Sequence, residues 1–410
     1  MTSDRNVPPA TNPRAAILYA AVATILVVCV IMLPAVAFQS AIAGLRIWWD
    51  VVFPALLPFF IGSEILVGLG VVHFLGVLME PFMRPLFNVP GTGSFVMAMG
   101  LASGYPIGTV LTSRLTSEGL CNPVEGERLM SFTNTADPLF MSGAVATGML
   151  GLPAAGGAIM FGHYLGALGV GLLLRFHDPH APASRPPDTG GDRHRTLLRR
   201  AIDALLAARA RDGRPLGQLL GDAVKNSVNT LLMIGGFIIL FSVLIQVLRA
   251  IGLVGILAAL VGRLTAVFGL NPGLTPSFIA GFFEISIGNQ VASQAAAPLA
   301  ERIVAASVIT AWSGISVVAQ VAAIIQGTGM RLYPYVLSRV VHAVLAGFLT
   351  WIYVTHIHLP TSTFVSGAPF SWTGALAAST RMFTLAVSGL FAASVVGAVY
   401  RSIRLVRFKA

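Results

Sequence analysis

Apolar residues along this chain gather in runs that are too long for the core of a soluble domain. A helix that crosses a bilayer needs about 20 predominantly apolar residues. Eight runs reach that length, and we predict each to be a transmembrane helix: 15–38, 51–72, 129–150, 153–175, 228–249, 302–326, 333–357 and 381–403. The predicted fold class is therefore an all-α polytopic membrane protein.

Two further apolar stretches, 74–113 and 252–292, are dense in glycine and proline. Proline removes a backbone donor and interrupts a helix. Interrupted backbone at membrane depth is tolerated only where protein surrounds it or where it lines a cavity. We therefore predict two re-entrant hairpins in these stretches, in addition to about eight crossings.

The halves of the chain on either side of a polar linker, 176–227, look alike. Ser63 and Ser242, Gly76 and Gly255, and Arg84 and Arg263 form three pairs with the same spacing. Matching motifs follow in the same order: VPGTGSF with NPGLTPSF, GLASGYPIG with GFFEISIGNQ, and SFTNTADPLF with ITAWSGISVVAQ. Their shared order indicates a diverged internal repeat.

Charge orients these repeats. The formal net charge is +10; the residues from Arg175 to Lys225 carry a net +4, and the last ten residues carry another +4. Basic segments beside apolar spans mark the cytoplasmic side. With the linker and both termini cytoplasmic, the first repeat starts outside and the second starts inside. Inverted repeats with broken helices are the architecture of secondary transporters.

The expected division of the chain follows from these patterns. The linker opens with a Pro/Gly-rich loop and continues as TLLRRAIDALLAARARDGRPL, which we expect to form a basic interfacial helix. The predicted segments are a cytoplasmic tail (1–14), a first helix and connector (15–50), repeat 1 (51–175), the linker (176–227), repeat 2 (228–358), and a last helix with a basic tail (359–410).

Composition excludes other classes of protein. Hydrophobic residues make up 55% of the chain and charged residues only 10%, against about 25% charged in soluble domains. A soluble enzyme, a nucleic-acid-binding factor and a disulfide-rich secreted domain are excluded. No P-loop, HExxH, GxSxG or cysteine-rich metal motif occurs in the sequence. We expect no enzymatic activity, no metal site and no cofactor, with H⁺ or Na⁺ as possible coupling ions.

Polar residues inside apolar stretches are the candidates for a solute path. Asn134, Thr135 and Asp137 lie beside Pro138, which frees nearby backbone carbonyls. A carboxylate at this depth should face a cavity or a partner. The alternative is a polar helix–helix contact made by Asn134 and Thr135.

The predicted hairpin tips supply further candidates. Ser103, Gly104, Tyr105 and Pro106 would form the first tip, where half-helix ends face a solute; a tight turn that only packs two short helices is the alternative. The second half contributes these residues: Glu284, Ser286, Asn289, Gln290 and, in its interrupted span, Ser313.

Glu284 and Glu64 are intramembrane carboxylates that could carry a coupling ion or a proton. Burial disfavours a charged carboxylate, which would let Glu284 take up a proton during transport. The alternative is a buried ion pair with Arg263 or Arg84. Histidines in apolar runs, such as His163, are more often packing residues than ligands, and we give them little weight.

The stretch from Phe53 to Gly151, with its SGYPIG and SFTNTADPLF segments, resembles the sporulation integral membrane proteins of the YlbJ type. These carry the nucleoside-recognition, or gate, domain, and the resemblance covers about 50–350. It implies a fold similar to concentrative nucleoside transporters, which are trimers, so a homo-oligomer is possible. It also implies a path lined by 103–106, 133–138, Glu284 and Asn289.

The same resemblance implies a role in spore formation, as a transporter that moves dipicolinic acid across the outer forespore membrane. Two alternatives remain: a cation-coupled nucleoside transporter, and a non-transporting membrane scaffold for the spore envelope. The expected partners are a small-molecule solute and the lipid bilayer, with no nucleic acid.

Overall fold

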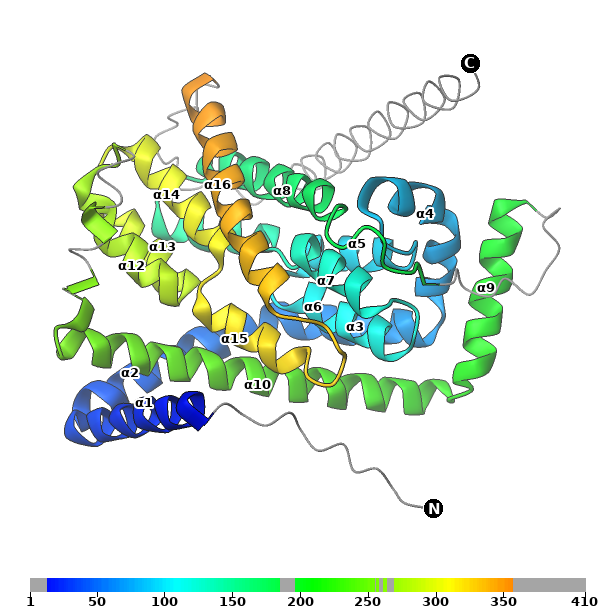
Figure 1. Ribbon diagram of the computed structural model, residues 1–410, viewed down its shortest axis with the longest axis horizontal. Helices are drawn as coiled ribbons and strands as arrows, with labels where there is room; N and C mark the ends of the chain where they lie inside the picture. The colour runs from blue at the N-terminus through cyan, green and yellow to red at the C-terminus, as the bar shows by residue number, and fades with distance from the viewer. Residues whose placement is uncertain (1–12, 185–195, 255, 258–260, 264–268, 357–410) are drawn as a thin grey trace, which may run out of the picture.

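The computed structural model describes residues 13–184, 196–254, 256–257, 261–263 and 269–356. Every regular element in these ranges is helical (Figure 1). Four of the described helices are long and apolar enough to cross a membrane, or up to six crossings if each bent pair counts as one. The chain is therefore an all-α polytopic membrane protein, as predicted. The expected last span, 381–403, and both tails lie outside the described residues.

The first apolar run is two helices rather than the single one expected over 15–38. Helix α1 (Pro13–Met32) ends before Leu33, and α2 (Pro34–Ile47) leaves it at a bend of 103°. Pro34 explains the break, because its nitrogen cannot donate to a preceding carbonyl and it fits the first position of a new helix. A short π-helix, η1 (Trp48–Val52), follows directly.

The next two helices form a second bent pair. Helix α3 (Phe53–Gly68) and α4 (Val71–Phe87) meet at 80°, at a turn where Gly70 takes a φ of 83°. The prediction of a single hairpin over the whole of 74–113 is therefore wrong in its extent. Helix α4 is a separate element, and the hairpin proper consists of α5 (Gly93–Ser103) and α6 (Ile107–Ser117), which pack against each other.

An interrupted span completes the first half. Asn122 caps α7 (Pro123–Thr133) by accepting from the Glu125 amide, and the Glu125 carboxylate accepts from the Asn122 amide in return. Residues 134–138 break the helix, η2 (Leu139–Met149) continues it as a π-helix, and α8 (Ala155–Leu174) follows.

The second half repeats this order. After α9 (Leu197–Asp212) and the long α10 (Leu216–Ala250) come a 3₁₀ turn, η3 (Pro272–Leu274), and a second hairpin of α12 (Thr275–Phe283) and α13 (Ile285–Ser293). Helices α14 (Leu299–Trp312) and α15 (Ile315–Ile324) form the interrupted span, and α16 (Tyr333–His356) follows it.

The two interrupted spans break at equivalent positions. Asn134 ends α7 and Ser313 ends α14, with the same spacing of 179 residues that separates His163 on α8 from His342 on α16. In Figure 1, α14, α16 and α8 lie next to one another, and their packing brings the halves together. Small residues allow this approach, since a Cβ on Gly162 of α8 would meet the Thr350 side chain of α16.

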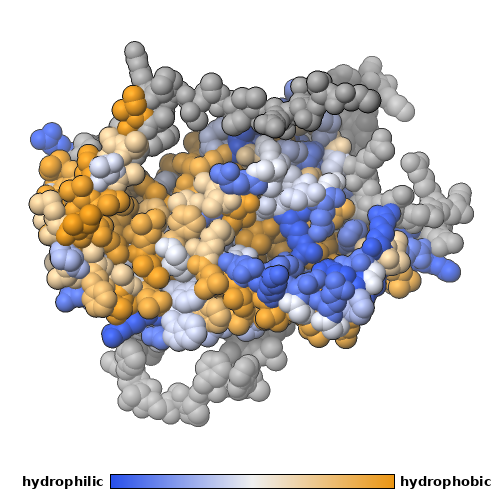
Figure 2. All heavy atoms as spheres, turned by 90° about the horizontal axis from the view of Figure 1, so that it is seen from below, coloured by the Kyte–Doolittle hydropathy of each residue, from blue (hydrophilic) through white to orange (hydrophobic). Residues whose placement is uncertain are grey.

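Polar side chains collect at one end of the molecule. In Figure 2 they gather toward the right, where α9 and the start of α10 lie in Figure 1, while hydrophobic side chains cover the opposite end. Helix α9, expected to be interfacial, packs Ala201 and Ala204 against Val77 of α4. Leu198 and Leu206 remain exposed on its other side, as suits a helix at a membrane surface.

Candidate functional site

The hairpin tip of each half lies against the interrupted span of the same half. Gly104, at the α5–α6 tip, has a φ of 82°, and a Cβ there would stand 2.5 Å from Asp137 Oδ2. Gly314, at the α14–α15 break, has a φ of 89°, and its Cβ would stand 2.8 Å from the Phe283 carbonyl, beside the α12–α13 tip. Glycine is required at both places, since other residues avoid this backbone conformation.

Tyr105 joins the two halves at these breaks. The Tyr105 hydroxyl donates to the Thr310 carbonyl on α14 at 3.1 Å. The same hydroxyl oxygen accepts from Arg339 Nη1 at 3.4 Å. Thr310 Oγ1 in turn accepts from Asn289 Nδ2 at 3.1 Å. Arg339 also donates to the Asn134 carbonyl at 3.0 Å. These five residues form a connected set, which we call the buried polar chain.

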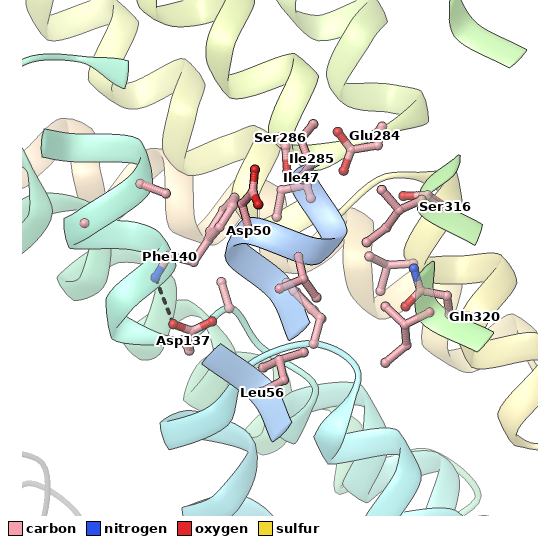
Figure 3. A pocket seen from close by; sticks show the side chains of 18 of the residues that line it. Ile47, Asp50, Leu56, Asp137, Phe140, Glu284, Ile285, Ser286, Ser316 and Gln320 are labelled. Carbon is pink, nitrogen blue, oxygen red and sulfur yellow. Dashed lines mark hydrogen bonds between the residues drawn. The ribbon is translucent and has the colours of Figure 1, made fainter. Parts of the chain in front are cut away.

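A cavity of about 610 Å³ lies between the halves, next to Tyr105. Its volume falls within the range of small-molecule sites, roughly 300–1,000 Å³. Most of its wall is apolar, with Leu56, Phe140 and Ile238 among the lining residues. Figure 3 shows Asp137 and Phe140 on one side, and Ser316 and Gln320 on the other.

Three carboxylates from separate elements line this cavity. Asp137 Oδ1 accepts from the Phe140 amide at 2.8 Å and so caps η2. Glu284 is only 5% exposed and caps α13, because its Oε2 accepts from the Ile287 amide at 2.7 Å. Asp50 lies on η1 and is exposed. The described lining contains no basic side chain.

Four predicted site residues line the cavity directly: Tyr105, Asp137, Glu284 and Ser286. Four others are buried at or beside the helix breaks, namely Ser103, Asn134, Asn289 and Ser313. Three of them, Ser103, Asn134 and Asn289, have a side-chain oxygen without a hydrogen-bond partner among the described residues. Buried polar atoms are normally paired, so these three oxygens could accept or donate a further hydrogen bond beside the breaks.

The remaining predicted residues lie elsewhere or have a partner in the protein. Thr135 donates to the Gly100 carbonyl at 3.2 Å, as in the alternative of a helix–helix contact. Pro106 is buried and follows a cis peptide bond, and Gln290 is exposed. Glu64 lies outside the cavity lining and forms an ion pair with Arg114 at 2.6 Å.

The ion pair considered for Glu284 does not occur. Arg84 binds Glu80 at 2.7 Å and also contacts Glu125, while Arg263 is exposed. Within the part of the chain that the structure describes, no basic side chain pairs with Glu284. Its stabilisation comes instead from the first amides of α13, where the helix dipole favours negative charge.

Several site residues escaped the sequence analysis. Asp50, Ser316 and Gln320 line the cavity. Asp50 stands just before an apolar run and belongs to no motif, whereas Ser316 and Gln320 lie within ITAWSGISVVAQ but were not selected as site residues. Tyr335 accepts from Asn134 Nδ2 at 2.8 Å, and Arg339 is completely buried. An arginine inside an apolar run is a usable signal for function, and Arg339 could have been found by it.

Metal binding has no support in this geometry. Among the described residues, no three His, Cys, Asp or Glu side chains are grouped so that they could hold a metal ion. The three carboxylates of the cavity therefore act as separate groups on separate elements.

Taken together, the apolar helices, the two interrupted spans and the cavity between the halves define an all-α polytopic membrane protein. Residues 49–169 match the family model described as Gate: Nucleoside recognition. The chain is 44% identical over 321 residues, 77% of each chain, to the sporulation integral membrane protein YlbJ of Bacillus subtilis (strain 168). No solved structure matches. The chain belongs to the YlbJ family of sporulation integral membrane proteins.

Proposed function

We propose that this protein is a secondary transporter that moves a small anionic aromatic solute, dipicolinic acid, across the outer forespore membrane. The observation that carries this proposal is the cavity of about 610 Å³ at the point where the helix breaks of both halves meet. A scaffold has no need of such a cavity, whereas a carrier of the inverted-repeat type binds its solute at the repeat interface.

The solute class follows from the wall of the cavity and from the relative. An aromatic ring fits the apolar wall, where Phe140 and Ile238 offer packing surface. Hydroxyl and amide groups of Ser286, Ser316 and Gln320 can donate to ring substituents. Participation in sporulation is supported by the name of the Bacillus subtilis relative.

The carboxylates of the cavity have a coupling role in this proposal. Asp137 and Glu284 would repel a dianion unless a proton or a cation neutralised them. Uptake of H⁺ or Na⁺ at these groups then permits the anion to enter, and this requirement couples the two fluxes. Glu64, which is paired with Arg114, has no part in this step.

The topology in this proposal has both termini and the linker 176–227 in the cytoplasm. The repeats then comprise 51–175 and 228–358, in opposite orientations. The end of the molecule where α9 lies and polar side chains gather faces the cytoplasm in this proposal, in agreement with the basic character of the linker.

A nucleoside is the second candidate solute, because the family model that matches residues 49–169 is described by nucleoside recognition. A nucleoside is neutral, so the carboxylates of the cavity would not repel it. Gln320 and Ser316 could bind its base through hydrogen bonds.

The test is uptake by the purified full chain in proteoliposomes. Labelled dipicolinate and labelled uridine are supplied in parallel, with and without gradients of H⁺ or Na⁺. Gradient-driven dipicolinate uptake is the expected result. Uptake of uridine alone would favour the second candidate, and uptake of neither by folded protein would favour the scaffold.

A further inference from the structure

Arg339 is a buried cation that has no carboxylate partner among the residues that the structure describes. It lies on α16 and is 0% exposed. Among the described residues it contacts neutral groups: the carbonyls of Ser131 and Asn134, the Tyr105 hydroxyl, His342 Nδ1 and, 5.0 Å from the guanidinium carbon, the ring of Tyr335. Its Nε has no hydrogen-bond partner among the described residues. Arginine keeps its charge even when buried, so an unmatched positive charge lies inside the protein.

The carbonyls and the ring of Tyr335 compensate the charge of Arg339 only in part. Ser131 and Asn134 lie at the end of α7, where the helix dipole presents partial negative charge. A buried arginine is normally matched by a full negative charge, because removing a cation from water is costly. Arg339 is therefore suited to an additional anionic partner.

Tyr105 places this charge next to the cavity. Its side chain lines the cavity, and its hydroxyl oxygen lies 3.4 Å from Arg339 Nη1. A phenol that accepts from a guanidinium becomes a better donor, since hydrogen bonds in a chain polarise one another. At present that donor serves the Thr310 carbonyl, an acceptor that a carboxylate could replace.

We propose that Arg339 is a positioning residue that makes this cavity prefer a carboxylate-bearing solute over a neutral one of the same shape, acting through the Tyr105 hydroxyl. The inference rests on the proposed function. In the loaded state a carboxylate of the solute replaces the Thr310 carbonyl as the acceptor of Tyr105. The positive charge of Arg339, behind the phenol, offsets part of the repulsion from Asp137 and Glu284.

The experiment compares two probes that differ in charge and little in shape: pyridine-2,6-dicarboxylate and pyridine-2,6-dicarboxamide. Their dissociation constants are measured on the full chain in lipid nanodiscs, for the wild type, R339Q, R339K and R128Q. Arg128 is the matched control, because it is 2% exposed and donates to the carbonyls of Asn88, His177 and Asp178, yet does not line the cavity.

The expected readout is the ratio of the two dissociation constants. R339Q should lower the preference for the diacid by about 10- to 100-fold, the range expected when a hydrogen bond to a charged group is lost. R339K, which retains the charge, should keep most of the preference, and R128Q should leave it unchanged. Should R339Q not insert, Tyr105→Phe serves instead, because it removes the hydroxyl that carries the effect.

The experiment distinguishes failure of the inference about Arg339 from failure of the proposed function. A wild type that prefers the diacid, with an R339Q variant of equal preference but lower thermal stability, would show that Arg339 only caps α7, and would overturn this inference alone. Equal loss in R339K and R339Q would also overturn it, since the charge would then not be the cause. A wild type that binds neither probe would overturn the proposed function together with the inference.

Discussion

The imidazole of His342 lies against that of His163, with 4.6 Å between the ring centroids. Its Nε2 donates to the His163 carbonyl at 2.7 Å across a separation of 179 residues. This spacing equals that between the two interrupted spans, so the two histidines hold equivalent places in the two repeats. The two histidines join α8 to α16, and Arg339, bound to His342, lies at the same contact.

Glu284→Gln should abolish gradient-driven flux while leaving insertion and solute binding intact. The amide removes the group that takes up a proton or cation, but its oxygen can still accept from the Ile287 amide. The measurement is dipicolinate uptake in proteoliposomes, with binding measured separately. Glu118→Gln is the control, because Glu118 pairs with Arg114 outside the cavity. Undiminished flux in Glu284→Gln would remove this residue from the coupling step.

Gly104→Ala should destabilise the protein more than Gly119→Ala. Both glycines have positive φ, 82° and 72°, so each alanine brings backbone strain of about 1–3 kcal/mol. Only at Gly104 does the added Cβ also meet a neighbour, Asp137, and overpacking costs about 1–3 kcal/mol more. Thermal unfolding in detergent measures the difference. Equal losses would show that the tip of the first hairpin is not tightly packed against η2.

Two glycines of α8 should respond to alanine with opposite signs. Gly162→Ala places a methyl group against Thr350 and the Ala346 carbonyl of α16, and should cost about 1–3 kcal/mol. At Gly157 the nearest atom, Tyr353 Oη, is 3.6 Å away, so alanine fits and its better helix propensity should stabilise by up to about 1 kcal/mol. Unfolding temperatures of the two variants give the signs directly.

Acidification should loosen the junction between α9 and α10, which lies outside the spans. Hydrogen bonds from Arg214 lower the pKa of Asp212 below its usual value. A carboxyl whose pKa is lower in the folded state stabilises the fold above its unfolded pKa of about 3.9, and this contribution disappears as the pH falls through the folded value. Limited proteolysis at pH 7 and pH 3 tests this. Asp212→Asn should be cleaved readily at both.

Helix breaks could be predicted from the sequence because they depend on local chemistry. Gly104, Pro106 and Pro138 disfavour continuous helix through their own backbone limits, whatever packs around them. The sharp bend at Leu33 was missed, although Pro34 marks the place, because a proline can either kink a span or begin a new helix. Which of the two happens at Pro34 depends on the packing of α2 against α10.

Which residues the charged side chains contact could not be predicted, since these contacts join segments distant in sequence. Glu64 looked like a coupling carboxylate until the fold placed Arg114 beside it. Asp50 joined the cavity because α2 and η1 lie against α10. Arg339 itself is visible in the sequence as a single charge within an apolar helix, but its contacts with Ser131 and Asn134 depend on the fold.

The cap that Glu284 provides gives this residue a mechanical role as well as an electrostatic one. Its Oε2 holds the first turn of α13, and the residue lines the cavity. In the proposed function, a proton or cation bound to this carboxylate would withdraw electron density from its hydrogen bond to the Ile287 amide. Loading the residue would then weaken the first turn of α13, and unloading would tighten it. Binding of an ion at Glu284 would then change the stiffness of the chain at the break between α12 and α13.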